Sequence, residues 1–139
     1  MIIKNRKFWN LFYKNNLAVS RPSNFAIFIL KFLKKNKSKV VDIGCGNGRD
    51  LIFFKKNKID FIGIDLSKNA TQLIKKKLKN AKDKNKIFNS DFVKFDYKKN
   101  VKTKFSIYSR FTWHTINKKN ESIFLKKISN LSYLTYLFI

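Results

Sequence analysis

The fold of this chain is decided by residues 39–50, which read KVVDIGCGNGRD. The stretch begins with β-branched apolar residues, which are typical of a strand buried on both faces. Gly44, Gly46 and Gly48 then let the backbone turn sharply at positive φ and leave room for a ligand against the main chain. Asp50 and Leu51 follow in a helical pattern, with the carboxylate placed where it suits the helix dipole. A strand, a glycine turn and a helix in this order predict the nucleotide-binding start of a doubly wound, Rossmann-like α/β domain.

The spacing of the glycines indicates which nucleotide is bound. The dinucleotide fingerprint is G-x-G-x-x-G, whereas this loop reads G-x-G-x-G and follows an acid, Asp42. An acid beside the loop would repel a pyrophosphate but accommodates the sulfonium and ammonium of S-adenosyl-L-methionine (SAM). The loop resembles motif I of the class I SAM-dependent methyltransferases, acid-x-G-x-G-x-G, at Asp42, Gly44, Gly46 and Gly48. The alternative is a tight turn without a ligand, which the concentration of three glycines in five residues disfavours.

Cys45 lies inside this loop. No paired base is evident near it, so we expect a small loop residue that contacts the cofactor and not a nucleophile. It is the single cysteine, which excludes a disulfide framework, and the chain has no Cys/His cluster with zinc spacing. We therefore expect no metal.

A second acid follows the second predicted strand, residues 59–65. Asp65 lies about 20 residues beyond the glycine loop, where a nucleotide site places its ribose-binding carboxylate. The run 63–67, GIDLS, also matches the second block of the resembled family, so Asp65 and Leu66 are expected to bind the cofactor. The alternative is that Asp65 caps the next helix, which we predict over residues 68–82 with Ser67 as its N-cap.

A third acid follows the short strand predicted over residues 86–89. The resembled family uses an acid followed by a hydrophobic residue to contact adenine, and Asp91 and Phe92 match that pair. The alternative for Asp91 is an ordinary turn-forming role.

The fourth predicted strand, residues 104–109, should lie on the other side of the first, so its end faces the switch-point crevice. Residues 108–114, YSRFTWH, resemble the fourth motif of a bacterial subgroup that carries Arg-Phe-x-x-His. Ser109 is then a cofactor contact. Arg110 is predicted to bind an anionic acceptor group, and His114, the only histidine, to act as general base toward a hydroxyl. A lone histidine is more often structural, which is the alternative for His114.

The N-terminal part is predicted to be helical. Residues 4–13 carry aromatic side chains at helical spacing, residues 17–21 form a linker, and Ser23 can cap a helix over residues 24–35. The resemblance implies that this segment closes over the ligand, so Tyr13 or Arg21 is a candidate contact. Aromatic packing and a surface arginine are the alternative.

The end of the chain departs from the resembled family. A helix over residues 118–130 and a strand over residues 131–139 give five strands at most, whereas the family core has seven in the order 3-2-1-4-5-7-6. We expect a single domain, residues 1–139, with an N-terminal helical segment (1–36) and a Rossmann-like core (37–139) that is incomplete at its C-terminus. The fifth strand should leave an apolar open edge.

Composition limits the partners. The net charge of +24 invites a nucleic-acid interpretation, but the lysines are spread along the chain and arginine is scarce. No apolar run reaches the ~20 residues of a membrane span, so we expect a cytoplasmic protein without a membrane span. The sequence predicts a SAM-dependent methyltransferase for a small, anionic or sugar-like hydroxylated acceptor. The alternatives are an NAD-dependent oxidoreductase, an inactive truncated fragment and a basic nucleic-acid-binding protein.

Overall fold

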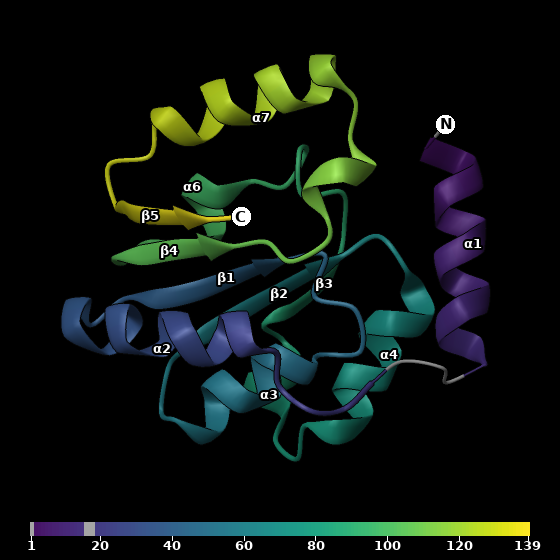
Figure 1. Cartoon of the computed structure of the whole chain (residues 1–139), viewed down its shortest axis with the longest axis horizontal. Coiled ribbons are helices and arrows are strands. Elements are labelled where there is room, and N and C mark those ends of the chain that lie inside the picture. Colours follow the sequence, from purple (N-terminus) through teal and green to yellow (C-terminus); the bar gives the residue numbers. More distant parts are fainter. Residues whose placement is uncertain (1, 16–18) are drawn as a thin grey trace.

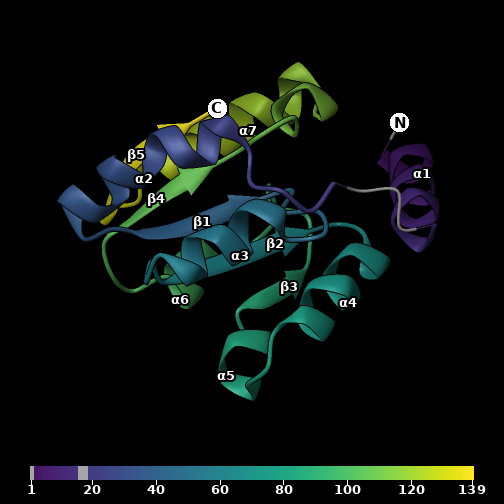
Figure 2. The same ribbon diagram turned by 60° about the horizontal axis from the view of Figure 1, so that its bottom comes forward.

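The computed structural model of the chain describes residues 2–15 and 19–139, with side chains from residue 6 onward. Five strands form one parallel sheet in the order β3-β2-β1-β4-β5, and helices cover both of its faces (Figures 1 and 2). The predicted α/β Rossmann-like fold and the strand order are confirmed. The strands are β1 (Lys39–Ile43), β2 (Phe61–Asp65), β3 (Ile87–Asn89), β4 (Phe105–Tyr108) and β5 (Leu134–Phe138).

The helices alternate with the strands, as parallel pairing requires. They are α1 (Ile2–Lys14), α2 (Asn24–Asn36), α3 (Arg49–Lys56), α4 (Lys68–Lys77), α5 (Ala81–Lys84), α6 (Tyr97–Asn100) and α7 (Lys118–Ser129), together with a short 3-10 helix, η1 (Trp113–Thr115). Ser23 accepts a hydrogen bond from the amide of Ala26 and Ser67 one from Ala70, so both serines cap α2 and α4 as predicted.

Alternate residues of each strand enter two separate cores, because successive side chains of a strand point to opposite faces. Val40 packs with α2, α3 and α4 through residues such as Leu33 and Phe54. Its neighbour Val41 packs on the other face with α6 and α7, through residues such as Phe124. Burial on both faces is complete in β2 and nearly complete in β1, which explains why apolar residues follow one another directly in these two strands.

The prediction of one helix over residues 68–82 is wrong. The helix α4 ends at Lys77, because Leu78 is extended, with φ −87° and ψ 128°, and buries its side chain in the core. Asn80 then caps the separate short helix α5 by accepting a hydrogen bond from the amide of Asp83. The lysine-rich pattern is helical on both sides of this break, so the sequence pattern alone does not reveal it.

The helix α1 lies against α4, beyond the carboxyl ends of the strands (Figure 1). It is joined to α2 through a segment predicted as a linker, of which residues 17 and 18 lie outside the described part of the chain. At the other side of the sheet, β5 pairs with β4 and forms the edge. No helix within residues 2–15 and 19–139 combines the length and apolar character needed to cross a membrane.

Candidate functional site

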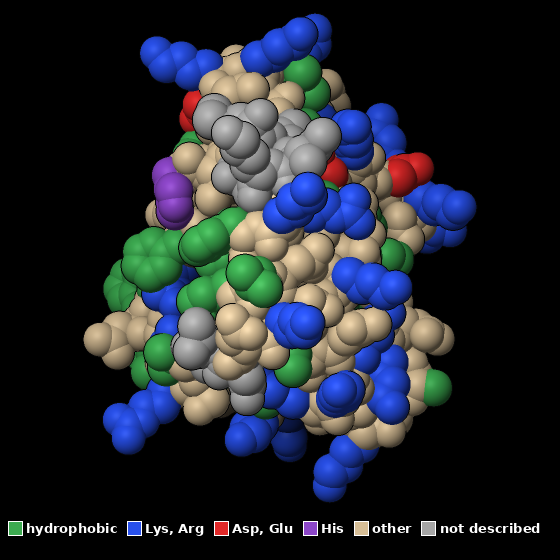
Figure 3. Space-filling model, turned by 90° about the vertical axis from the view of Figure 1, so that its right-hand side faces the viewer, with side chains coloured by type: hydrophobic (Ala, Val, Ile, Leu, Met, Phe, Trp, Pro, Cys, Tyr) green, Lys and Arg blue, Asp and Glu red, His purple; other side chains and the backbone are tan. Residues whose placement is uncertain are grey.

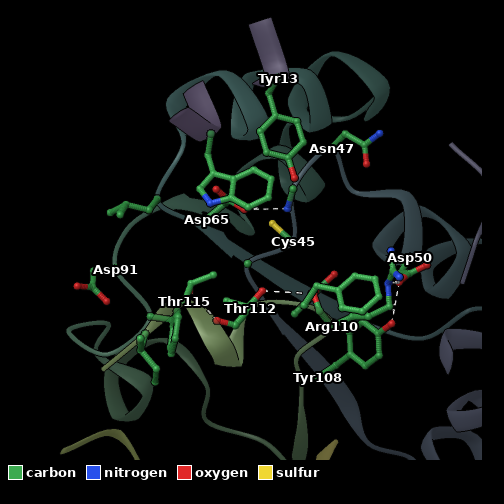
Figure 4. Close-up of a pocket in the computed structure, with 18 of the residues that line it drawn as sticks. Tyr13, Cys45, Asn47, Asp50, Asp65, Asp91, Tyr108, Arg110, Thr112 and Thr115 are labelled. Atoms are coloured by element: carbon green, nitrogen blue, oxygen red, sulfur yellow. Dashed lines mark hydrogen bonds and ion pairs between the residues drawn. The ribbon is translucent and has the colours of Figure 1, made fainter. Parts of the chain in front are cut away.

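A cavity of about 370 Å³ opens at the carboxyl ends of β1, β2 and β4, the edge where ligands bind in open parallel sheets. Its walls are the glycine loop, α1, the turn after β3 and the segment that leads from β4 to α7. Figure 4 shows their side chains converging on one space. We call this cavity the glycine-loop pocket. Its volume falls in the range that small-molecule sites occupy.

The glycine loop needs its glycines for conformation and for close approach. Gly44, Gly46 and Gly48 have φ values of 71°, 54° and 75°, the left-handed region that favours glycine. A Cβ atom at Gly44 would lie 2.0 Å from Thr112 Oγ1, and one at Gly46 would lie 2.3 Å from the Tyr13 hydroxyl. The first two glycines therefore admit side chains from α1 and from the segment after β4 close to the loop backbone.

Gly48 has a different role. It does not line the pocket, and a Cβ atom there would lie 2.7 Å from Ile74 Cγ1 of α4. Gly48 was predicted to contact the cofactor, but in the structure it lies where two helices pack. Its missing side chain lets α3 and α4 approach each other.

Asp65, at the end of β2, connects this strand to the glycine loop. Its Oδ2 accepts a hydrogen bond of 2.8 Å from the amide of Gly46, and its Oδ1 one of 2.8 Å from the amide of Ser67. Burial raises the pKa of this carboxyl, while the two amides act in the opposite direction. A carboxylate has about four lone-pair sites, so each oxygen can still accept a second hydrogen bond from the cavity.

Four of the eight acidic residues in the chain line this pocket: Asp42, Asp50, Asp65 and Asp91. The basic residues among the described lining residues are Arg49 and Arg110, and none is a lysine, although the chain carries a net charge of +24. Burial, with Asp50 and Asp65 nearby, raises the pKa of Asp42 well above its usual value. A cation entering the pocket would reverse that effect, because it favours the ionised carboxylates.

Asp50 is the centre of a buried polar network that ties α2 and β4 to the start of α3. Its carboxylate accepts hydrogen bonds from the Ser23 amide (2.7 Å), the Ser23 hydroxyl (2.8 Å) and the Tyr108 hydroxyl (2.7 Å). Arg110 Nε lies 3.4 Å from Asp50 Oδ2, and Arg49 Nε lies 3.7 Å from Oδ1. The sequence placed Asp50 only at a helix start, and its partners come from segments 27 and 58 residues away.

Asp91 and Phe92 lie where the sequence predicted, after β3 and in the pocket lining together with Leu66. Asp91 Oδ1 accepts a hydrogen bond of 2.9 Å from the Val93 amide, so the turn-forming interaction is present as well. The Phe92 side chain is buried, and its carbonyl accepts a hydrogen bond from the Tyr97 hydroxyl, which fixes this turn. The pair therefore presents a fixed carboxylate and an apolar surface to one side of the cavity.

The segment after β4 separates into residues inside and outside the pocket. Arg110 lines it, with its guanidinium 4.4 Å from the centroid of the Phe111 ring. His114 is exposed on η1 and stands on the surface in Figure 3, outside the pocket lining. Ser109 is buried and also lies outside this lining, against a neighbouring cavity. The structure thus brings Asp42, Gly44, Cys45, Gly46, Asp65, Leu66, Asp91, Phe92 and Arg110 together, but not Gly48, Ser109 or His114.

Several pocket residues were not singled out in the sequence. Asn47 holds the loop in place by donating to the Val19 carbonyl, and Thr112 packs against Gly44. Asn117 and Asn120, at the start of α7, line the far side. Asn47 could have been found from its place between two loop glycines, but the others follow only from where the chain returns after β4. Tyr13, a candidate from the resemblance, lines the pocket from α1, and its burial raises the pKa of its phenol, which stays protonated.

Comparison with known proteins shows the family of the chain. Residues 40–132, two thirds of the chain, match the family model described as a methyltransferase domain. The chain belongs to this methyltransferase family. The matched range begins in β1 and includes the glycine loop, Asp65, Asp91 and Arg110.

One curated relative is the carboxy-S-adenosyl-L-methionine synthase of Nautilia profundicola, 37% identical over 87 residues. That alignment covers 61% of this chain and 35% of the relative. The chain thus matches about a third of the length of this relative.

Solved structures share the fold. Magnesium protoporphyrin IX methyltransferase from Synechocystis PCC 6803, with bound SAH, superposes with a TM-score of 0.70 at 13% identity. The superposition covers 98% of this chain and 71% of that enzyme's chain. The sugar N-methyltransferase KedS8 from Streptoalloteichus superposes with a TM-score of 0.61 at 15% identity, covering 87% of this chain and 47% of its own. At these identities, the likeness shows the fold.

Proposed function

We propose that this chain binds S-adenosyl-L-methionine in the glycine-loop pocket and transfers its methyl group to a small hydroxylated acceptor, anionic or sugar-like. The observation that supports the proposal is that acidic residues gather at this pocket, whereas the chain as a whole is strongly basic. Half of the acidic residues of a strongly basic chain line one cavity, and Asp65 there is bonded to the loop that would hold the ligand. A cationic ligand with a ribose is the chemistry that this arrangement favours.

The residues fit such a ligand part by part. The free acceptor sites of Asp65 suit the two vicinal hydroxyls of a ribose, because its oxygens each accept only one backbone hydrogen bond. Asp91 can accept a hydrogen bond from the adenine amino group, and Phe92 presents an apolar surface beside it. Gly44 and Gly46 line the pocket together with Asp42, and the amino-acid part is proposed to lie beside them.

The reaction needs little covalent chemistry from the protein. The bound sulfonium supplies an electrophilic methyl carbon, which an acceptor oxygen attacks in line as the carbon–sulfur bond breaks. The protein positions the two reactants and lets a proton leave the acceptor hydroxyl. Arg110 lies in the pocket wall and is proposed to hold an anionic group of the acceptor.

The base role predicted for His114 stays a hypothesis. Its exposed position on η1, outside the pocket lining, favours the alternative of a surface residue. In the proposed reaction the proton can pass to water at the pocket mouth.

Calorimetric titration tests the proposal. We expect SAM and S-adenosylhomocysteine to bind one site per chain, and NAD not to bind, since the carboxyl group of Asp42 beside the glycine loop would repel the pyrophosphate of NAD. Tight binding of NAD without binding of SAM by the folded protein would replace this proposal with the oxidoreductase alternative.

A further inference from the structure

A second cavity, of about 650 Å³, adjoins the glycine-loop pocket and has the opposite charge. Four residues line both: Val19, Arg49, Arg110 and Phe111. The second cavity lies between the start of α2 and the segment after β4, and we call it the arginine cavity. No acidic residue is among the described residues that line it.

Arginine is scarce in this chain but concentrated in the arginine cavity. The chain has four arginines, and three of them, Arg21, Arg49 and Arg110, line it. Arg49 and Arg110 approach a single carboxylate, Asp50, at 3.7 and 3.4 Å, and that carboxylate already accepts three shorter hydrogen bonds. Positive charge and unused N–H donors therefore remain at the cavity.

Two buried polar atoms give an independent indication of a ligand. Within the described part of the chain, Arg49 Nε and Ser109 Oγ are the buried side-chain nitrogen and oxygen atoms without a hydrogen-bond partner. Both residues line the arginine cavity. Ser109 is only 2% exposed, and leaving such groups unpaired costs free energy. A ligand with several acceptor oxygens would satisfy both.

We infer that the arginine cavity binds a phosphoryl group of the methyl acceptor. Three guanidinium groups and a hydroxyl suit a group with three acceptor oxygens and a charge near −2, more than a carboxylate with two oxygens and one charge. Since the two cavities share Arg110 and Phe111, an acceptor anchored there can extend its hydroxyl into the glycine-loop pocket. This inference rests on the proposed function for the nature of the acceptor, but the anion site itself does not depend on it.

Arg21 allows a test that leaves the fold intact, because its side chain is exposed and makes no described ion pair. The matched control is Arg6, the one arginine outside the cavity, which is exposed on α1. The probe is inorganic phosphate, titrated by calorimetry at constant ionic strength into the whole chain, its Arg21→Gln variant and its Arg6→Gln variant. Acetate is titrated as the carboxylate probe.

We expect one phosphate site per chain that Arg21→Gln weakens by about ten-fold or more, the loss of one charge-assisted contact. Arg6→Gln should leave it unchanged, acetate should bind at least about ten-fold more weakly, and phosphate affinity should rise with pH as inorganic phosphate loses its second proton. Equal losses in both variants would show diffuse attraction to a lysine-rich surface and overturn the inference. Equal binding of acetate would overturn the phosphoryl assignment.

Binding of S-adenosylhomocysteine is measured on the same samples. Phosphate binding without S-adenosylhomocysteine binding would contradict the proposed function and leave the anion site standing. S-adenosylhomocysteine binding without an Arg21-dependent phosphate site would contradict the inference alone. Ser109→Ala gives a second check on the cavity, with an expected loss of phosphate affinity of a few-fold.

Discussion

The Asp65 carboxylate accepts a hydrogen bond of 2.8 Å from the amide of Gly46, across 19 residues of sequence. This contact joins the end of β2 to the loop after β1, so the ribose-binding candidate and the glycine loop form one unit. A ligand that engages either of them also depends on the other.

Substitution of Asp65 should therefore weaken ligand binding strongly, because it affects the ribose contacts and the glycine loop together. Asp65→Ala removes the carboxylate from the loop amide and from the expected ribose contacts, and we expect SAM affinity to fall by ~100-fold or more, as the loss of two charge-assisted hydrogen bonds implies. Asp60, which directly precedes the same strand and is half exposed, is the matched control. Calorimetry should show Asp60→Ala binding SAM normally, and equal affinity in both variants would contradict the assigned role.

The contact between Gly46 and Tyr13 can be tested by a double-mutant cycle. A Cβ atom at Gly46 would lie 2.3 Å from the Tyr13 hydroxyl oxygen and 3.0 Å from its ring carbon, at a φ of 54°. Gly46→Ala should destabilise the protein by ~1–3 kcal/mol through the strained backbone and this clash. In a Tyr13→Phe background the cost should be smaller, because the closest atom is gone. Urea unfolding measures all four proteins, and simple additivity would show that Tyr13 does not lie over the loop.

The Asp50 network should contribute to stability as well as to the site. Tyr108→Phe leaves the ring in the core and removes its 2.7 Å hydrogen bond to Asp50, so we expect a loss of ~1–2 kcal/mol in the free energy of unfolding. Asp50→Ala should cost ~3–5 kcal/mol, because it removes the one carboxylate that pairs with both Arg110 and Arg49 and that accepts the buried hydrogen bonds of Ser23 and Tyr108. Denaturant unfolding is the measurement, and equal, small effects of both changes would contradict a central role for Asp50.

The raised pKa of Asp42 predicts a pH-dependent effect on stability. The carboxyl is fully buried and its folded-state pKa lies well above its unfolded value, so its favourable contribution is complete at low pH and is lost as pH rises through the folded pKa. Asp42→Asn removes the cost of the buried charge. We expect its melting temperature to exceed that of the parent chain at pH 8 by roughly 3–6 °C, with the difference shrinking toward pH 4.

The control for that measurement is Asp60, whose pKa is shifted in the opposite direction. Burial acts to raise the pKa of Asp60, but hydrogen bonds from Lys86 and Lys39 outweigh it and lower the pKa. Its small contribution is present above the unfolded pKa and is lost on acidification. Asp60→Asn should therefore not gain stability at pH 8. A parent chain more stable than Asp42→Asn at pH 8 would contradict the assignment for Asp42.

The sequence predicted what local pattern determines. Residues 39–50 specified a buried strand, a glycine turn and a helix, and Ser23 and Ser67 marked two helix starts, because caps and positive φ angles depend on neighbours in sequence. The positions of Asp65 and Asp91 followed from strand ends, since parallel strands present their carboxyl ends at one edge.

The sequence pattern could not predict contacts that depend on tertiary packing. The break after Lys77 depends on the burial of Leu78, and Gly48 acts through Ile74 of another helix. Arg49 and Arg110 both approach Asp50 only because the fold places the end of β4 beside the start of α3. His114 has the spacing of the resembled motif but lies on the outer side of η1, because a single turn of 3-10 helix sets which way each side chain points.

The central claim is that a SAM molecule occupies the space between Asp65 and the glycine loop. The most direct test is an amide NMR titration of the labelled chain with SAM. We predict saturable shifts at the amides of Gly44, Gly46 and Ser67, the last two of which are bonded to Asp65, and no such shifts with NAD. If SAM leaves these amides unchanged while the protein stays folded, or if NAD alone moves them, the account is contradicted.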